Sequence, residues 1–425
     1  MAKMKKRKIF SLIAILLIIV VILAVWIKVQ NKKSQTIINL TAEQKLEDFN
    51  FLCRTLDESY PFWTDVSNAG IDKEAIYAAY LQNIQKTKTD ISYFKELGYF
   101  LKEFKGFGHL SVLDGYMYKL YFDTVAASDA MLSEQEAGKV APLISALTSD
   151  VSTRTYGQLD QSHSGFRSTI GLKEEYQNDI DVEGETIDAS IEKEILSPGK
   201  VAYIKVPSFQ LTNYQRDEAV LSEFFDEVVD YTDLIVDLRG NAGGSDLYWQ
   251  NLLVKPNAQT GLISKRYFLF NQNETTQSYI EANAPSAALV EDSTDPILRK
   301  YADSFSHYTQ DVSQFSQAER PFKGKIWVLV DEDVYSASEN FVVFCKNTGF
   351  GTLVGTTTGG DGGIADPILV SLPNSGLLVR FSMFYGLNTD GTGNEAHGTS
   401  PDYLIAEGED ALEACLAQIN TKLEF

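Results

Sequence analysis

Short apolar runs alternate with amphipathic stretches over the second half of the chain. Each apolar run is long enough for one buried strand, and these runs are 200–207, 234–239, 325–330 and 352–355. Apolar residues recur at helical spacing in the stretches 215–230, 245–254, 337–347 and 409–422. Strands that alternate with helices predict a mostly parallel sheet covered on both faces. We therefore expect an α/β core over residues 198–425.

Two segments interrupt this alternation. Residues 366–385 read as a hairpin that turns at Pro373-Asn-Ser-Gly376, because turn-forming residues separate two apolar runs. Residues 255–320 are rich in Gln, Asn, Ser, Tyr and Phe and form an insertion in the core. We expect this insertion to be a lid or a wall beside a substrate, and the alternative is a disordered decoration.

The pattern before the core is helical. Thr41-Ala-Glu-Gln44 has the form of a capping box at a helix start, and Asp72 and Asp90 are candidate caps of two more helices. We expect residues 40–108 to form a small helical domain. Residues 109–197 lack the Gly-Leu-Gly-Phe type of loop of a PDZ domain, so they are predicted to be a connecting region without a PDZ module.

A basic cluster followed by a long apolar run opens the chain. The basic residues are Lys3, Lys5, Lys6, Arg7 and Lys8. At ~1.5 Å per residue, the apolar residues 9–27 nearly match a ~30 Å hydrocarbon core. A cleaved signal peptide is the alternative, but its apolar region has about 7–15 residues and ends in a small-x-small site. The expectation is thus a transmembrane signal anchor within residues 1–36, with residues 9–27 in the lipid bilayer.

Charge asymmetry about the expected anchor predicts its orientation. Lys and Arg favour the cytoplasmic side, so the expected product is a single-pass protein of the cell membrane with its amino terminus in the cytoplasm and the rest of the chain extracytoplasmic. The chain has a net charge of −21, and the part beyond residue 35 stands at −29. This acidity argues against nucleic acid as a partner. Cys53, Cys345 and Cys415 are too few and too scattered for a disulfide framework or a metal cluster, so we expect no metal and no cofactor.

The segment Val334-Tyr-Ser-Ala-Ser-Glu-Asn340 lies where the apolar run ending at Asp331 gives way to a helix. A Ser at such a junction has its hydroxyl near unpaired N–H groups and the positive end of the helix dipole, which suits an oxyanion. Ser336 is therefore the best candidate for a nucleophile. On this segment alone, the alternative is that Ser336 or Ser338 caps the helix.

A second segment, Asp233-Leu-Ile-Val-Asp-Leu-Arg-Gly-Asn-Ala-Gly-Gly-Ser245, supplies another buried strand that ends in a glycine turn. Together with Ser336-Ala-Ser-Glu339, it resembles the tail-specific, or C-terminal processing, serine protease family. Pro198–Phe209 resembles the strand that opens the catalytic core of that family, and Asn394–Asp402 resembles its late Glu-Gly-x-Gly-x-x-Pro-Asp segment. The resemblance covers residues 198–405 and implies a crotonase-like, or ClpP-like, spiral α/β core.

One departure from the family pattern concerns the base. Bacterial members commonly use a Ser-Lys dyad, with the Lys in a Phe-Gly-Lys-Gly turn after the nucleophile helix. Here the turn is Thr356–Gly363, and Asp361 stands about where the Lys would be. A carboxylate cannot replace a desolvated amine base, and a Ser hydroxyl needs a base in hydrogen-bond reach. Either the protein is catalytically silent, or the base comes from another segment.

The segment Lys105-Gly-Phe-Gly-His-Leu-Ser111 resembles the Gly-His segment of the tricorn-core branch of the same family. That branch uses Ser and His supported by a late Glu, and the matching late residue is Glu395. A Ser precedes the His in the tricorn core, whereas Gly108 stands here, so the resemblance implies a Ser336–His109–Glu395 set. His397 is a rival base, because it lies two residues from Glu395 on an extended segment.

Acyl transfer also needs N–H groups aimed at the developing oxyanion. Ala337 and either Gly243 or Gly244 are the candidate donors, and the sequence leaves the choice of glycine open. The leading hypothesis is a membrane-anchored, extracytoplasmic serine peptidase that cleaves peptides or protein C-terminal segments, with Ser336 as nucleophile and His109 as general base. The alternative is a silent relative that binds a peptide or an apolar ligand. The sequence leaves the substrate and the oligomeric state open.

Overall fold

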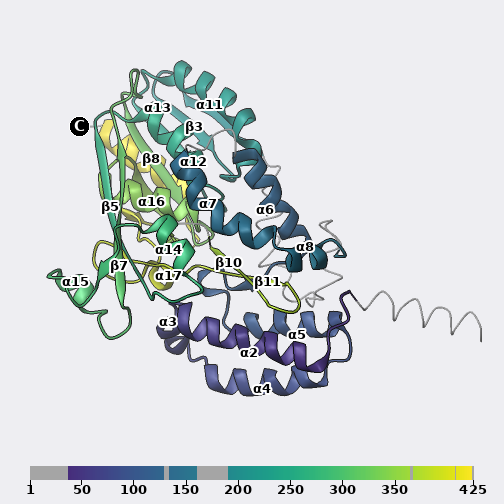
Figure 1. Cartoon of the computed structure of the whole chain (residues 1–425). Helices are drawn as coiled ribbons and strands as arrows, with labels where there is room; N and C mark the ends of the chain where they lie inside the picture. Colours follow the sequence, from purple (N-terminus) through teal and green to yellow (C-terminus); the bar gives the residue numbers. More distant parts are fainter. Residues whose placement is uncertain (1–36, 129–133, 160–189, 364–366, 407, 424–425) are drawn as a thin grey trace, which may run out of the picture.

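The fold is seen in a computed structural model that describes residues 37–128, 134–159, 190–363, 367–406 and 408–423 (Figure 1). A six-stranded sheet of order β13-β9-β8-β4-β3-β2 forms the core. Its strands are β2 (Glu192–Ser197), β3 (Val201–Lys205), β4 (Asp233–Asp237), β8 (Lys325–Val330), β9 (Thr352–Gly355) and β13 (Tyr403–Leu404). Strands β3, β4, β8, β9 and β13 are parallel to one another, and the edge strand β2 pairs antiparallel with β3. The predicted mostly parallel α/β sheet is confirmed.

Helices cover both faces of this sheet, as the unbroken apolar runs of its strands require. On β4, Leu234 and Val236 face one helical layer and Ile235 faces the other, because successive side chains of a strand point to opposite faces. The first layer holds η3 (Leu211–Asn213), α11 (Tyr214–Val228), α12 (Asp246–Trp249), η4 (Gln250–Val254), α13 (Lys255–Asn257) and α16 (Ala337–Thr348). Helix α18 (Ala411–Leu423) covers the second face.

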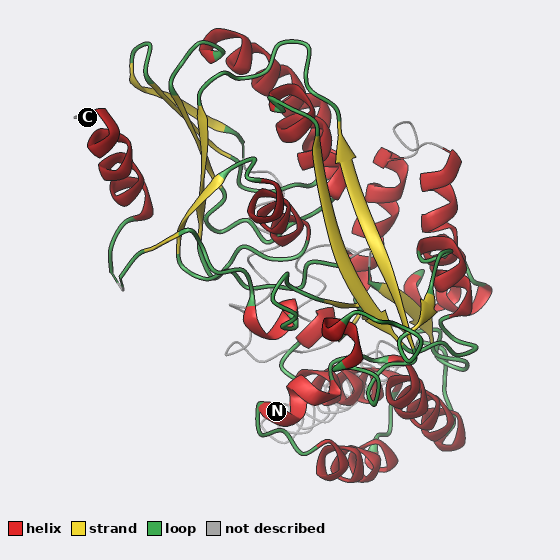
Figure 2. Ribbon diagram, turned by 90° about the vertical axis from the view of Figure 1, so that its left-hand side faces the viewer, coloured by secondary structure: helices red, strands yellow, loops and turns green. Residues whose placement is uncertain are grey.

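The insertion predicted at 255–320 forms an ordered β-ribbon instead of an irregular decoration. Its strands β5 (Leu262–Phe270) and β7 (His307–Phe315) pair antiparallel along their full length, and Figure 2 shows them as the two longest strands. The four-stranded sheet β12-β5-β7-β6 is completed by β6 (Ala288–Leu289) and β12 (Tyr385–Gly386). Two short helices belong to the same region, α14 (Gln277–Asn283) and α15 (Pro296–Arg299).

The amino-terminal helices pack onto a third, three-stranded sheet. These helices are α2 (Ala42–Ser59), α3 (Trp63–Asn68), α4 (Lys73–Lys86) and α5 (Asp90–Lys102), side by side at the bottom of Figure 1. The sheet has the order β1-β11-β10, with β1 (Ser111–Val112), β10 (Ile368–Ser371) and β11 (Leu378–Phe381). Strands β10 and β11 confirm the hairpin predicted around residues 373–376. Phe49, Phe100 and Leu378 share one hydrophobic core, so segments from both ends of the chain are packed together.

Along the chain, three helices come between β1 and the core sheet: α6 (Gly115–Ser128), α7 (Glu134–Leu147) and α8 (Asp150–Tyr156).

Two of the three helix caps predicted from the sequence are confirmed. Thr41 forms the capping box with Gln44, and Asp72 caps α4. At the third helix the cap is Thr89 instead of Asp90. Asp90 is buried, and its carboxylate accepts hydrogen bonds from four successive backbone N–H groups of residues 37–40. The domain boundaries at residues 36, 108 and 197 stay predictions.

The expectation of a membrane-spanning helix is corrected. A span requires about 20 consecutive, mostly apolar residues in one helix. Among the residues that the structure describes, no helix is both long and apolar enough to cross a membrane. The segment 9–27, on which the expectation rested, lies outside the described residues. The single-pass membrane localisation inferred from it is therefore not supported.

Candidate active site

Ser336 lies at the sharp turn between β8 and α16. Its backbone has φ 58° and ψ −123°, a conformation that a non-glycine residue rarely adopts and that costs of order 1–3 kcal/mol. The Ser336 side chain makes no capping hydrogen bond to the helix. The capping alternative therefore does not account for Ser336, and the strained turn presents its hydroxyl to a pocket.

Ser338, the second serine of this segment, has a structural role. Its side chain is fully buried, and its hydroxyl donates to Asn241 Oδ1 over 2.6 Å. Asn241 Oδ1 also accepts the Gly243 N–H at 2.9 Å, and Asn241 Nδ2 donates to the Val206 carbonyl. Asn241 thereby ties the glycine turn after β4 to the nucleophile helix.

The glycines of that turn are required by close backbone contact. A Cβ on Gly243, which has φ 107°, would lie 2.8 Å from the Tyr335 carbonyl oxygen and 3.0 Å from the Ala337 nitrogen. A Cβ on Gly244, which has φ 138°, would lie 2.3 Å from the Phe209 carbonyl carbon. The turn approaches Ser336 because Gly243 lacks a side chain, and it approaches the backbone of Phe209 because Gly244 lacks one.

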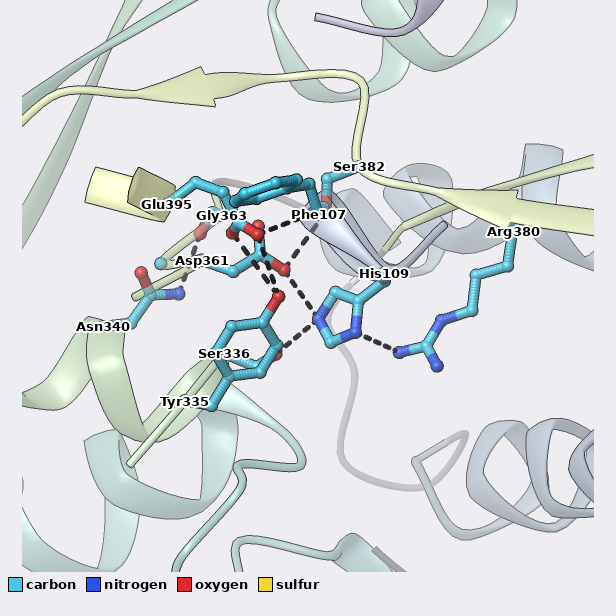
Figure 3. A network of polar contacts seen from close by, with 12 residues as sticks. Phe107, His109, Tyr335, Ser336, Asn340, Asp361, Gly363, Arg380, Ser382 and Glu395 are labelled. Atoms are coloured by element: carbon cyan, nitrogen blue, oxygen red, sulfur yellow. Dashed lines mark hydrogen bonds and ion pairs between the residues drawn. The ribbon is translucent and has the colours of Figure 1, made fainter. Parts of the chain in front are cut away.

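His109 reaches Ser336 from the opposite wall. Its Nε2 atom lies 3.3 Å from Ser336 Oγ, although the two residues are 227 positions apart in the sequence. The short helix η1 (Phe107–His109) precedes β1, and β1 pairs with β11 so that Ser111 stands opposite Arg380. This pairing brings the His109 ring between Arg380 on one side and Ser336 and Asp361 on the other (Figure 3).

The partners of the His109 ring determine which nitrogen carries the proton. Nδ1 lies 3.2 Å from Arg380 Nη2, and Nε2 lies 2.7 Å from Asp361 Oδ2. An arginine side chain has only donors, so its contact requires a lone pair on Nδ1. A neutral ring then carries its proton on Nε2, which faces Ser336 Oγ and Asp361 Oδ2. We assign this tautomer from the hydrogen-bond partners.

Glu395 stays a proposed member of the site, and its carboxylate is held next to the segment that carries His109. Among the described residues it forms no hydrogen bond to His109; instead its Oε1 accepts the Gly108 N–H at 2.8 Å, and the Tyr335 hydroxyl lies 3.4 Å from both of its oxygens. Burial, together with the nearby Asp361, raises the pKa of Glu395 well above its usual value. The carboxyl group beside the imidazole is that of Asp361, which the sequence had placed outside the chemistry.

Gly108 explains why a relay serine is missing. This residue has φ 57°, and a Cβ there would lie 2.1 Å from the Phe62 ring. A serine at this position would clash with Phe62, so the segment has backbone but no side chain to offer Glu395.

The rival base His397 is exposed at the end of α17 (Asn394–His397), and the structure gives it no hydrogen bond to Ser336. The segment around it is fixed by Glu339 of the Ser-Ala-Ser-Glu sequence. Glu339 Oε1 accepts from Asn394 Nδ2 at 2.6 Å and from Thr399 Oγ1 at 2.5 Å. Burial raises the pKa of Glu339, so this carboxyl is a structural group.

These groups meet in a cavity of about 580 Å³. Ser336, His109, Ala337, Gly243, Gly244, Asp361 and Arg380 all contribute to its wall. Further parts of the wall come from α6 and α7 and from the ribbon strands β5 and β7. Within the described part of the chain, no group of three or more His, Cys, Asp or Glu side chains is placed to hold a metal ion.

Sequence reasoning missed the role of Arg380 and the contact of Asp361. Arg380 was visible as the single charged residue within Leu377-Leu-Val-Arg-Phe-Ser-Met-Phe384. A cation in an otherwise apolar strand signals a specific partner, because burying a charge is costly unless it is paired.

Known proteins that resemble this chain were found at the level of a sequence family and at the level of the fold. The model of peptidase family S41 matches residues 200–405. No curated protein sequence matches the chain. Among solved structures, a candidate peptidase from Parabacteroides merdae ATCC 43184 has 19% identity and a TM-score of 0.52, and the match covers 90% of this chain and 97% of that one. Mature CPAF complexed with lactacystin has 14% identity and a TM-score of 0.51, covering 91% and 98%.

A match to the tricorn protease has a TM-score of only 0.30, with 19% identity, and covers 57% of this chain and 19% of that one. It therefore carries no weight for a tricorn-like set of residues. At such identities the structural matches show the fold alone. Over residues 200–405 the chain is thus similar to peptidase family S41, and it shares the fold of these solved structures.

Proposed function

We propose that the chain is a serine peptidase that hydrolyses peptide bonds, in peptides or in C-terminal segments of proteins, by acyl transfer through Ser336. The observation that carries this proposal is the 3.3 Å separation between Ser336 Oγ and His109 Nε2 at the wall of the cavity. A hydroxyl becomes an effective nucleophile when a base within hydrogen-bond reach accepts its proton. The strained backbone of Ser336 adds support, because such strain concentrates at functional sites.

In the proposed reaction, Ser336 Oγ bonds to the substrate carbonyl carbon while its proton passes to His109 Nε2. The proton then moves from Nε2 to the leaving nitrogen as the C–N bond breaks, and an acyl-enzyme forms. Water attacks the acyl carbon by the same route and restores Ser336. Glu395 acts on His109 indirectly, through the Gly108 backbone.

Two backbone N–H groups are proposed to bind the oxyanion. Ala337 is the first residue of α16, so its N–H has no partner within the helix. Between the two glycines, Gly244 is the better donor. The Gly243 N–H already donates to Asn241 Oδ1. Phe209 pairs with the Gly243 carbonyl and the Ser245 N–H, and these hydrogen bonds do not use the Gly244 N–H.

A second function is favoured by the contact between Arg380 Nη2 and His109 Nδ1, from which the Nε2–H tautomer is assigned. In this tautomer the ring cannot accept the proton of Ser336. A silent relative that binds a peptide or an apolar ligand in the cavity would retain such a site. The two functions differ in whether Ser336 can react.

An ethoxy fluorophosphonate probe tests the choice, because it forms a covalent bond only with an activated serine. We expect peptide mapping to find the probe on Ser336 in the unaltered protein, and labelling to be lost in Ser336→Ala. Ser338→Ala is a poor control because Ser338 holds Asn241, so exposed Ser400→Ala serves as the matched variant. A Ser336 that stays unlabelled after prolonged exposure to the probe, in a folded protein that still binds peptide, would establish the silent relative instead.

A further inference from the structure

Arg380 connects the substrate cavity with the base. Its Nη2 atom contacts His109 Nδ1, and its guanidinium carbon lies 5.7 Å from the centre of the Tyr121 ring on α6. The same side chain lines the cavity that Ser336 faces. A group that entered the cavity and bound Arg380 would therefore change the surroundings of His109.

The present position of Arg380 opposes the reaction in two ways. A base for Ser336 must carry its proton on Nδ1 and leave Nε2 free, but an Nδ1–H would point at an arginine donor. The imidazolium formed after proton transfer would also set two cations side by side. Asp361 Oδ2 lies 2.7 Å from Nε2 on the other side of the ring; the Tyr335 ring, with its centre 5.0 Å from that of His109, and Glu395 behind Gly108 complete the surroundings.

The cavity wall carries one more cationic than anionic side chain, although the chain is acidic. The wall holds four cationic side chains, Lys139, Lys255, Arg266 and Arg380, against three aspartates, Asp246, Asp311 and Asp361. The whole chain has a net charge of −21, so this local excess is opposite in sign to the rest of the molecule. A carboxylate is the group that such a wall attracts, and arginine binds it through two parallel hydrogen bonds.

We propose that a carboxylate of the substrate draws Arg380 away from His109 Nδ1 and thereby activates Ser336. This inference rests on the proposed peptidase function and names its substrate class: peptides with an acidic side chain, or a free C-terminal carboxylate, near the bond to be cleaved. Once Arg380 has moved, Nδ1 takes a proton from water and the Nε2 proton passes through Asp361 to water. The ring stays neutral, and the lone pair of Nε2 faces Ser336 Oγ.

Replacement of Arg380 tests the resting contact. Arg380→Met removes the charge and the donors, so we expect fluorophosphonate labelling of Ser336 to become about tenfold faster or more. Arg380→Lys should keep labelling slow, because it keeps a cation. Arg320→Met, at an exposed arginine paired with Asp226, is the matched control and should label at the original rate. Labelling of Arg380→Met at or below the original rate would overturn the inference.

The substrate class is tested by three peptides. Ac-Ala-Ala-Ala-Glu-Ala-Ala-NH2 carries a side-chain carboxylate, Ac-hexaalanine carries a terminal carboxylate, and Ac-Ala-Ala-Ala-Gln-Ala-Ala-NH2 carries neither. We expect kcat/KM to be about tenfold or more higher for at least one acidic peptide than for the neutral one, and the preference to vanish in Arg380→Met. Equal values for all three peptides in the unaltered protein would overturn the substrate class.

A third measurement does not depend on turnover. In Ser336→Ala protein with ¹⁵N-labelled histidine, the His109 Nδ1 resonance should start at the position of an unprotonated ring nitrogen. An acidic peptide should move it to that of a protonated nitrogen, and the neutral peptide should not. If Ser336 never reacts with the probe, the peptidase proposal fails, but this titration still tests whether a carboxylate draws Arg380 away from His109. If the Nδ1 resonance does not move at a saturating concentration of acidic peptide, the proposed movement of Arg380 is refuted and the peptidase proposal is not affected.

Discussion

The Ser336 half of the site is made within the core sheet, whereas the His109 half is assembled from segments far apart in the chain. The β8–α16 turn and the glycine turn after β4 follow neighbouring parallel strands and are joined through Asn241. His109, by contrast, depends on β1–β11 pairing, on Asp361 in the Gly-rich turn and on Arg380. A motif can specify the first arrangement locally, but the second exists only once the chain has folded.

The largest expected effect tests whether His109 is the base. His109→Ala removes the proposed base, so kcat for peptide hydrolysis should fall by about 10³–10⁶ with little change in KM. His397→Ala is the matched control, because His397 is exposed, and its kcat should stay within about twofold of the original. Steady-state kinetics on one peptide substrate measures both variants. The reverse result, with His397 essential and His109 dispensable, would mean that the base has been misassigned.

A smaller effect tests the Ser336 half. Gly243→Ala forces a Cβ against the Tyr335 carbonyl and the Ala337 nitrogen, so the oxyanion donors should shift and kcat should fall by about 10². Gly199→Ala has a similar positive φ of 71° and open space for a Cβ. Its free energy of unfolding, measured with urea, should fall by ~1 kcal/mol because alanine is strained at a positive φ, and its kcat should not fall. Equal kcat in the two alanine variants would show that the close approach at Gly243 is not needed for catalysis.

The smallest effect concerns Glu395 and pH. Its pKa is raised in the folded protein above the usual value of 4.5, so the folded state holds a proton that the unfolded state releases. This contribution is fully present below about pH 4.5 and is lost as the pH rises toward the folded-state pKa. Glu395→Gln mimics the protonated form and should lack this loss, so its free energy of unfolding relative to the original protein should increase with pH.

Urea unfolding between pH 4 and pH 8 measures this difference, with the exposed Glu227→Gln as control. A difference between Glu395→Gln and the original protein that stays constant over this range would show that Glu395 is ionised alike in both states.

Local pattern explains which features could be predicted from sequence. Buried strands such as 325–330 and 352–355 are continuous apolar runs, so their pattern predicts both the strand and the parallel sheet. Ser336 was found because it stands at a junction visible in the sequence. The role of Asp361 was missed because a carboxylate was compared only with the family's lysine. Its distance to His109 is set by tertiary pairing that no local pattern reports.

Competition between partners explains the remaining differences. Glu395 was expected to orient His109 directly or through one water, and its carboxylate accepts the Gly108 N–H. Asp90 was expected to cap α5, but the backbone N–H groups of residues 37–40 take its side chain, and Thr89 caps the helix. In both cases the residue type was read correctly as an acceptor. Its donor, however, came from a segment 50 or more positions away.

The β1–β11 pairing also has a consequence for the order of events during protein synthesis. The ribosome makes His109 early and Ser336 227 residues later, but β1 finds its partner only when residues 378–381 have appeared. A nascent or truncated chain that stops before this strand lacks the support that aligns the imidazole. Unfinished chains should therefore carry a Ser336 that lacks its proposed base.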